Sequence, residues 1–141
     1  AERVERADRE FALRVVKITK DRLQRLSEFE SLTWYLFDEP PLDKKLLVFK
    51  KSTPQKSKEG LEKAQKSLEI IGEKEWTMQN IQKSLEDVVK QGELTNGDVF
   101  WPVRYGLSGQ EASSSPAELA WALGKEKTLA RLKKSLALIS V

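Results

Sequence analysis

The sequence contains no cysteine and no histidine, a single methionine, and no long uninterrupted hydrophobic run. The absence of cysteine excludes disulfides, thiolate nucleophiles and cysteine-based zinc sites. Without histidine, the commonest general base and the commonest metal ligand are also missing. No apolar stretch approaches the roughly 20 residues of a membrane span, and no glycine-rich phosphate-binding loop is present. Catalysis by these residues is therefore not expected, and neither is a place in a membrane.

The chain opens with AERVERADRE, a charged segment that has no apolar signal core. Nothing in it directs export, so a cytoplasmic location is expected. Because this segment starts in the middle of a helical pattern, we expect the chain to be part of a longer protein. A length of 141 residues suits one domain or two small subdomains with a modest core.

The small net charge of +3 hides an uneven distribution along the chain. Residues 43–66 carry eight basic and three acidic side chains, and residues 125–141 carry five and one. Between them, residues 67–124 carry four basic and nine acidic side chains. Segregated Lys and Arg suit a contact with a polyanion, because neutralised phosphates release counterions. The same blocks are also compatible with ordinary solvated helix faces, so charge alone leaves both interpretations open.

Apolar residues follow helical spacing along the whole chain. The spacing and the capping residues predict helices over 11–29, 43–50, 53–72, 77–92, 98–107, 115–124 and 125–139. Thr53 with Pro54 is a typical helix start, and Ser115 with Glu118 forms a capping box. Gly72 is expected to be a left-handed helix end, and 96–97 a turn before the next helix.

Few segments alternate with a period of two, so no strand is predicted. We expect an all-α fold, a compact bundle of about six to eight short helices. Frequent glycine and proline argue against one long coiled coil. In the last helix, Leu129 and Leu132 are expected to be buried, with Lys127, Arg131 and Lys134 on the opposite side.

The aromatic residues admit two interpretations. They could stack on unpaired bases, or they could fill the core at helix junctions. Core packing is the favoured prediction for most of them, with Trp101 the one expected to be partly exposed, beside Arg104. The residues concerned are Trp34, Tyr35, Phe37, Phe100 and Trp101.

Four stretches carry more specific information than period and charge. They are WPVRYGLSG (101–109), LGKEKTLARLKKSLALI (123–139), RLQRLSEF (22–29) and WYLFDEP (34–40). In their order and spacing they resemble the closing motifs of bacterial-type glutamyl-tRNA synthetases. The resemblance covers roughly residues 11 to 139.

The resemblance implies the anticodon-binding domain of a class I aminoacyl-tRNA synthetase. Residues 1–38 would end a first helical subdomain, and residues 39–141 would form a second. The two ATP-handling signatures of the catalytic core are absent here, so this chain would bind without catalysing and would carry no cofactor. The full enzyme would attach glutamate to tRNA(Glu) with ATP and magnesium. Its expected partners are tRNA(Glu) and the catalytic domain of the same polypeptide, in a monomer.

Position by position, the resemblance gives Arg104 as the arginine that reaches the anticodon. Arg22 matches the arginine associated with the third anticodon base, although it also fits an ordinary surface residue of a basic helix. In this scheme Trp101 lies beside Arg104 at the anticodon.

The loop after Gly109 departs from the family. Relatives often have Ser/Thr-Pro-Gly at 113–115, so Ser114 and Ser115 stand in the places of the Pro and Gly. Ser113, Ser114 and Pro116 are the residues expected to approach the anticodon. Glu118 is interpreted as the capping-box carboxylate, and Glu86 stands where some relatives place arginine.

For the tRNA backbone, the basic last helix supplies the candidates Lys125, Lys127 and Arg131. A competing hypothesis is a helical protein-docking module, motivated by the acidic middle of the chain and the apolar patch at 34–37. Salt dependence would separate the two, because a tRNA complex weakens steeply with added salt and an apolar interface does not.

Overall fold

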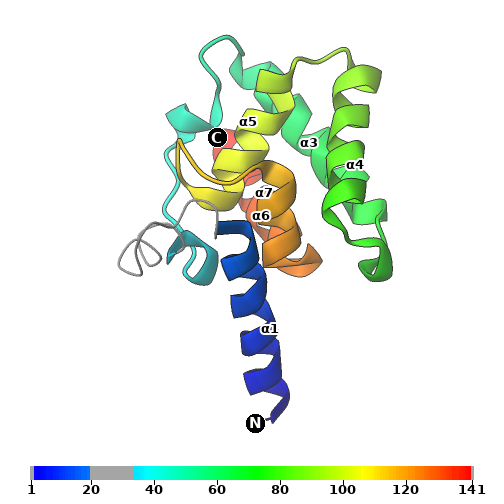
Figure 1. Ribbon diagram of the computed structural model, residues 1–141. Coiled ribbons are helices and arrows are strands. Elements are labelled where there is room, and N and C mark those ends of the chain that lie inside the picture. The colour runs from blue at the N-terminus through cyan, green and yellow to red at the C-terminus, as the bar shows by residue number, and fades with distance from the viewer. Residues whose placement is uncertain (1, 20–33, 141) are drawn as a thin grey trace.

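A computed structural model describes residues 2–19 and 34–140 of the chain (Figure 1). Those residues form helices and no strands, which confirms the all-α prediction. The α-helices are α1 (Glu2–Thr19), α3 (Pro54–Ile70), α4 (Met78–Gly92), α5 (Asn96–Ser108), α6 (Pro116–Leu123) and α7 (Lys125–Ile139). Two short 3-10 helices are η2 (Lys44–Leu47) and η3 (Glu73–Glu75).

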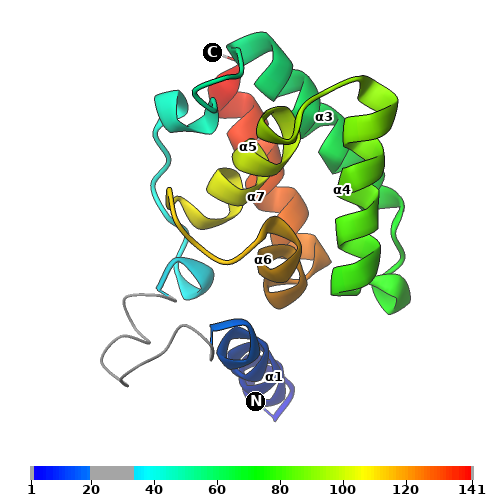
Figure 2. The same cartoon turned by 45° about the horizontal axis from the view of Figure 1, so that its top comes forward.

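The helices gather around α3, α5 and α7, which pack against one another. α4 lies along the outer side of α3, and α6 connects α5 to α7 (Figures 1 and 2). α1 packs against α6 and extends away from the rest of the bundle. No helix of the described ranges has the length and apolarity to cross a bilayer, and no group of three acidic side chains there could hold a metal ion.

One continuous apolar core joins the helices. Leu61 and Leu68 of α3, Leu85 of α4, Val103 of α5 and Leu132 of α7 are all completely buried. Full burial of side chains of this size contributes roughly 1.5–3 kcal/mol each. In α1 the predicted apolar stripe is confirmed as far as Ile18, and its continuation to residue 29 lies outside the described residues.

Two glycines bring the central helices into close contact. A Cβ on Gly60 of α3 would collide with the carbonyl of Asp98 in α5, lying only 2.9 Å from the carbonyl carbon. A Cβ on Gly106 of α5 would come within 2.5 Å of the Ser135 hydroxyl in α7. Pro102 adds to the first contact, because it has no N–H to donate to the Asp98 carbonyl four residues earlier. α5 is thus held tightly between α3 and α7.

Local signals fixed most helix starts correctly. Thr53 and Thr77 accept the backbone N–H groups of Lys56 and Asn80 as N-caps. Asp43 caps η2, although that turn ends at Leu47, before the predicted residue 50. Such caps depend on residues only two or three positions away, which is why the sequence reveals them.

Two further predicted boundaries, besides the end of η2, are wrong. α5 begins at Asn96 and not at Asp98, because Thr95 is the N-cap and the Asp98 carboxylate completes a capping box with it. Residues 96–97 therefore form the first helical turn, and Pro102 lies well inside the helix. Gly72 is not left-handed, since its φ is −66° and its carbonyl instead starts η3 by accepting from the Glu75 N–H.

The aromatic residues divide between core and surface. Tyr35 is buried, Phe100 is half-buried against the core, and Trp101 is half-buried beside Leu46 and Phe49. The prediction of core packing is wrong for Trp34 and Phe37, which are 36% and 46% exposed. Phe37 instead lies edge-on to Phe11 of α1, with ring centres 5.0 Å apart.

Candidate nucleic-acid interface

Arg104 lies near the end of α5, one turn after Trp101. Its guanidinium carbon is 5.1 Å from the centre of the Trp101 ring, a cation–π distance. Its Nη2 donates a hydrogen bond of 2.8 Å to the carbonyl of Glu111, in the loop that follows the helix. The predicted pairing of Arg104 with a partly exposed Trp101 is confirmed. These contacts hold a half-buried positive charge at the junction of α5 and the loop.

Trp101 is itself held by the segment around η2. Its indole Nε1 donates to the carbonyl of Leu46 at 2.7 Å, and the Phe49 ring centre is 5.3 Å away. One turn further along α5, the Tyr105 hydroxyl accepts the N–H of Asp43 at 2.8 Å. The sequence identified Trp101 but not this segment as its neighbour. The concentrated positive charge of residues 43–66 was the signal that could have singled the segment out.

The loop from Gly109 to Ser115 starts in a left-handed turn, with φ of +66° at Gly109. Its backbone runs past Arg104, but the side chains of Ser113, Ser114 and Pro116 point inward. Ser113 and Ser114 are 6% and 1% exposed, and Pro116 is buried as well. The structure therefore brings the predicted loop beside Arg104, with its surface made by the backbone and by the exposed Glu111 and Ala112.

The start of α6 is organised as predicted. The Ser115 Oγ accepts the N–H of Glu118 at 3.3 Å, and a Glu118 carboxylate oxygen accepts the N–H of Ser115 at 3.2 Å. Both partners of the capping box are present, which confirms the structural interpretation of Glu118. This reciprocal pair fixes the direction in which the loop enters α6.

Lys125 and Lys127 lie in a different place, at the start of α7. They line a cleft of about 540 Å³ together with α1, η3 and α6, and no residue of α5 contributes to it. The Lys127 ammonium lies 4.1 Å from the ring centre of Phe11. Lys17 of α1 lies 5.4 Å from the ring centre of Trp121, so two cation–π contacts join α1 to the rest of the chain.

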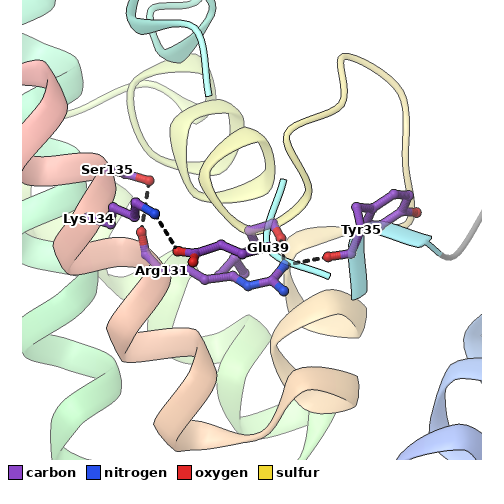
Figure 3. Close-up of polar contacts among 6 residues, drawn as sticks. Tyr35, Glu39, Arg131, Lys134 and Ser135 are labelled. Carbon is purple, nitrogen blue, oxygen red and sulfur yellow. Dashed lines mark hydrogen bonds and ion pairs between the residues drawn. The ribbon is translucent and has the colours of Figure 1, made fainter. Parts of the chain in front are cut away.

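Arg131 is not on the surface, and its predicted place beside Lys127 and Lys134 is wrong. It is 8% exposed, and its Nη1 donates to the carbonyls of Tyr35 and Leu107, both at 2.7 Å (Figure 3). Leu107 belongs to the last turn of α5, where carbonyls have no partner inside the helix. Burial lowers the pKa of Arg131, an effect that the nearby Glu39 carboxylate opposes. A phosphate on the surface would not meet this guanidinium.

Lys134, one turn further along α7, shows the contrasting environment. Its ammonium pairs with the Glu39 carboxylate at 2.8 Å, in a bridge whose side chains are 62% and 54% exposed (Figure 3). The hydrogen bond and charge of Lys134 lower the pKa of Glu39. Arg22, the remaining predicted anticodon residue, lies outside the described residues.

Comparisons with known proteins agree with this architecture. A family profile described as "Anticodon binding domain" matches residues 1–136. The chain is 34% identical over 135 residues to a glutamate–tRNA ligase of Clostridium botulinum, a match that covers 93% of this chain and 28% of the relative. It is 36% identical over 124 residues to a glutamate–tRNA ligase of Herpetosiphon aurantiacus, covering 87% of this chain and 25% of that protein.

A solved structure has a similar fold. A glutamate tRNA ligase from Elizabethkingia meningosepticum, crystallised with its amino acid, matches with a TM-score of 0.73 and 20% sequence identity. The match covers 91% of this chain and 25% of that protein. The chain thus spans about a quarter of the length of the proteins it is similar to.

Proposed function

This chain belongs to the anticodon-binding domain family, and from that premise we propose that it binds the anticodon stem-loop of tRNA(Glu). The observation that carries the proposal is the Arg104 guanidinium, held against the Trp101 ring beside the 109–115 loop. The full protein would be a glutamate–tRNA ligase that attaches glutamate using ATP and magnesium, as the similarity to such ligases supports. Family membership favours this function over the protein-docking alternative.

The chemistry of the site suits an unpaired base. A guanidinium can donate to the edges of bases and stack on their faces. A partly exposed indole offers a second stacking surface, and base–aromatic stacking contributes about 1–3 kcal/mol per base. The neighbouring loop backbone adds further polar groups. Together they would hold one splayed anticodon base and read its edge.

The proposal predicts that Arg104→Ala weakens binding of the glutamate anticodon stem-loop by roughly 10- to 100-fold, the effect of losing a base contact of about 1–3 kcal/mol. Binding of the glutamine stem-loop should weaken less, because the lost contact reads a base. Fluorescence anisotropy with labelled RNA hairpins at two salt concentrations would measure both affinities.

Lys127→Ala is the matched control, since it removes one positive charge from a cleft that no residue of α5 lines. Any loss in this variant should be smaller and equal for the two hairpins. If both substitutions weakened both hairpins to the same degree, base recognition by Arg104 would be wrong.

The proposal also includes the expected division into subdomains, the role of Arg22, the cellular location and the oligomeric state. The division into 1–38 and 39–141 would place α1 in a first subdomain that leads back to the catalytic domain of the same polypeptide. Arg22 would then contact the third anticodon base. We expect the full protein to be a cytoplasmic monomer.

A further inference from the structure

The segment of residues 44–51, here called the basic turn, carries a concentrated positive charge. It consists of η2 and the loop that follows, and its lysines Lys44, Lys45, Lys50 and Lys51 are all exposed. From residue 44 to residue 58 there are six lysines and no aspartate or glutamate. These four lysines precede α3, so their exposure and clustering cannot be explained as the solvent-facing side of a long helix.

The basic turn is attached to the same tryptophan that contacts Arg104. The Leu46 carbonyl accepts the Trp101 indole hydrogen at 2.7 Å, and Phe49 packs on the Trp101 ring. Arg104 lies over that ring at 5.1 Å. In both views the chain around η2 and the 109–115 loop flank the same side of α5 (Figures 1 and 2). The segment that carries these lysines is thus attached to α5 next to the candidate anticodon site.

The acidic groups around the basic turn accept hydrogen bonds or form ion pairs with groups other than its lysine ammonium groups. The Asp43 carboxylate accepts the N–H of Lys45 as the N-cap of η2. The Asp98 carboxylate is buried and accepts from Ser52 and from the N–H of Thr95. Glu39 pairs with Lys134. Within the part of the chain that the structure describes, no carboxylate forms an ion pair with the four lysines.

We propose that the basic turn binds the sugar-phosphate backbone of the tRNA beside the bases that Arg104 contacts. This inference rests on the proposed function and adds a surface to it. Lysine ammonium groups neutralise phosphates without reading sequence, so they position the RNA while Arg104 supplies selectivity. The basic turn would therefore set affinity and its salt dependence, and leave the preference for one anticodon unchanged.

The test compares two variants of equal net charge. One replaces Lys44, Lys45, Lys50 and Lys51 by Gln. The control replaces four exposed lysines that lie outside the basic turn, in α3, η3 and α4: Lys66, Lys74, Lys83 and Lys90. Anisotropy titrations with the glutamate and glutamine hairpins would run between about 50 and 200 mM salt, a range over which phosphate contacts change affinity strongly.

We expect the basic-turn variant to bind the glutamate hairpin on the order of 100-fold more weakly at the lowest salt. The slope of log K against log salt should become shallower by about 2–4 in the basic-turn variant. In the control the slope should change by less than about 1. The ratio of the two hairpin affinities should stay the same in both variants. Equal weakening of the two variants would overturn the proposal, because the total charge of the chain alone would then account for the loss.

The outcomes also separate this inference from the proposed function. Selective binding whose salt slope is unchanged in the basic-turn variant would overturn the inference alone. Unselective binding that the basic-turn variant loses would overturn anticodon recognition by Arg104 and leave the basic turn standing. A native chain that bound neither hairpin would overturn both.

Discussion

Replacing Arg131 by Met is expected to lower the free energy of unfolding by about 2–5 kcal/mol, because two buried carbonyls lose their donor and each unpaired group costs roughly 1–3 kcal/mol. Those carbonyls belong to Tyr35, before η2, and to Leu107, in the last turn of α5. Met fills a similar volume, so the change isolates the hydrogen bonds and not the packing. Urea denaturation followed by circular dichroism would measure it as a shift of the midpoint at constant slope.

The neighbouring Lys134→Met is the matched control. It removes the same charge from the same helix, but from an exposed pair with Glu39 that should contribute less than about 1 kcal/mol. A stability loss of the same size in both variants would show that charge, and not the buried hydrogen bonds, is what α7 requires at Arg131.

The Arg131 contact also connects to the candidate site. Leu107 lies two residues before Gly109, where the loop contacted by Arg104 begins. Where Arg131→Met remains folded, we expect weaker binding of the glutamate hairpin and a reduced preference over the glutamine hairpin. Lys134→Met should leave that preference unchanged.

Gly60→Ala is expected to destabilise the chain by about 2 kcal/mol or more, although alanine is the better helix former by about 1 kcal/mol. The added methyl would collide with the backbone carbonyl of Asp98, and backbone cannot rotate away as a side-chain end can. α3 and α5 would have to separate, which would open the core between Leu61 and Val99. Thermal and urea unfolding would report the loss.

Gly92→Ala, at the end of α4, is the control for that substitution. The nearest atoms to its Cβ would be side-chain atoms of Leu94 and Lys63, at 3.1 and 3.2 Å, and not a backbone carbonyl. Its effect should stay within about 1 kcal/mol in either direction. If Gly60→Ala proved as mild as Gly92→Ala, the close contact of α3 with α5 would not be a determinant of stability.

The candidate site was predictable in part. The motif 101–109 identified Arg104 and Trp101, and the structure places them in contact. Ser113 and Ser114 were correctly placed in the loop after Gly109, but their burial was not foreseen, because a serine-rich loop gives no sign of which way its side chains point. The attachment of Leu46 and Phe49 to Trp101 joins residues more than 50 positions apart, and no local pattern reports that.

By itself, the sequence determined the helical class, most helix starts and the capping box at Ser115, since each depends on spacing or on neighbours within one turn. Only the tertiary structure decided which charged residues are buried. Helical period put Lys127, Arg131 and Lys134 on one side of α7, which is wrong for the buried Arg131, because the period cannot say whether water or a backbone carbonyl lies opposite. Arg131 meets two carbonyls from distant segments, and Lys134 meets solvent and Glu39. Their environments differ because they depend on which parts of other helices lie against α7, and the helical period of α7 carries no information about those parts.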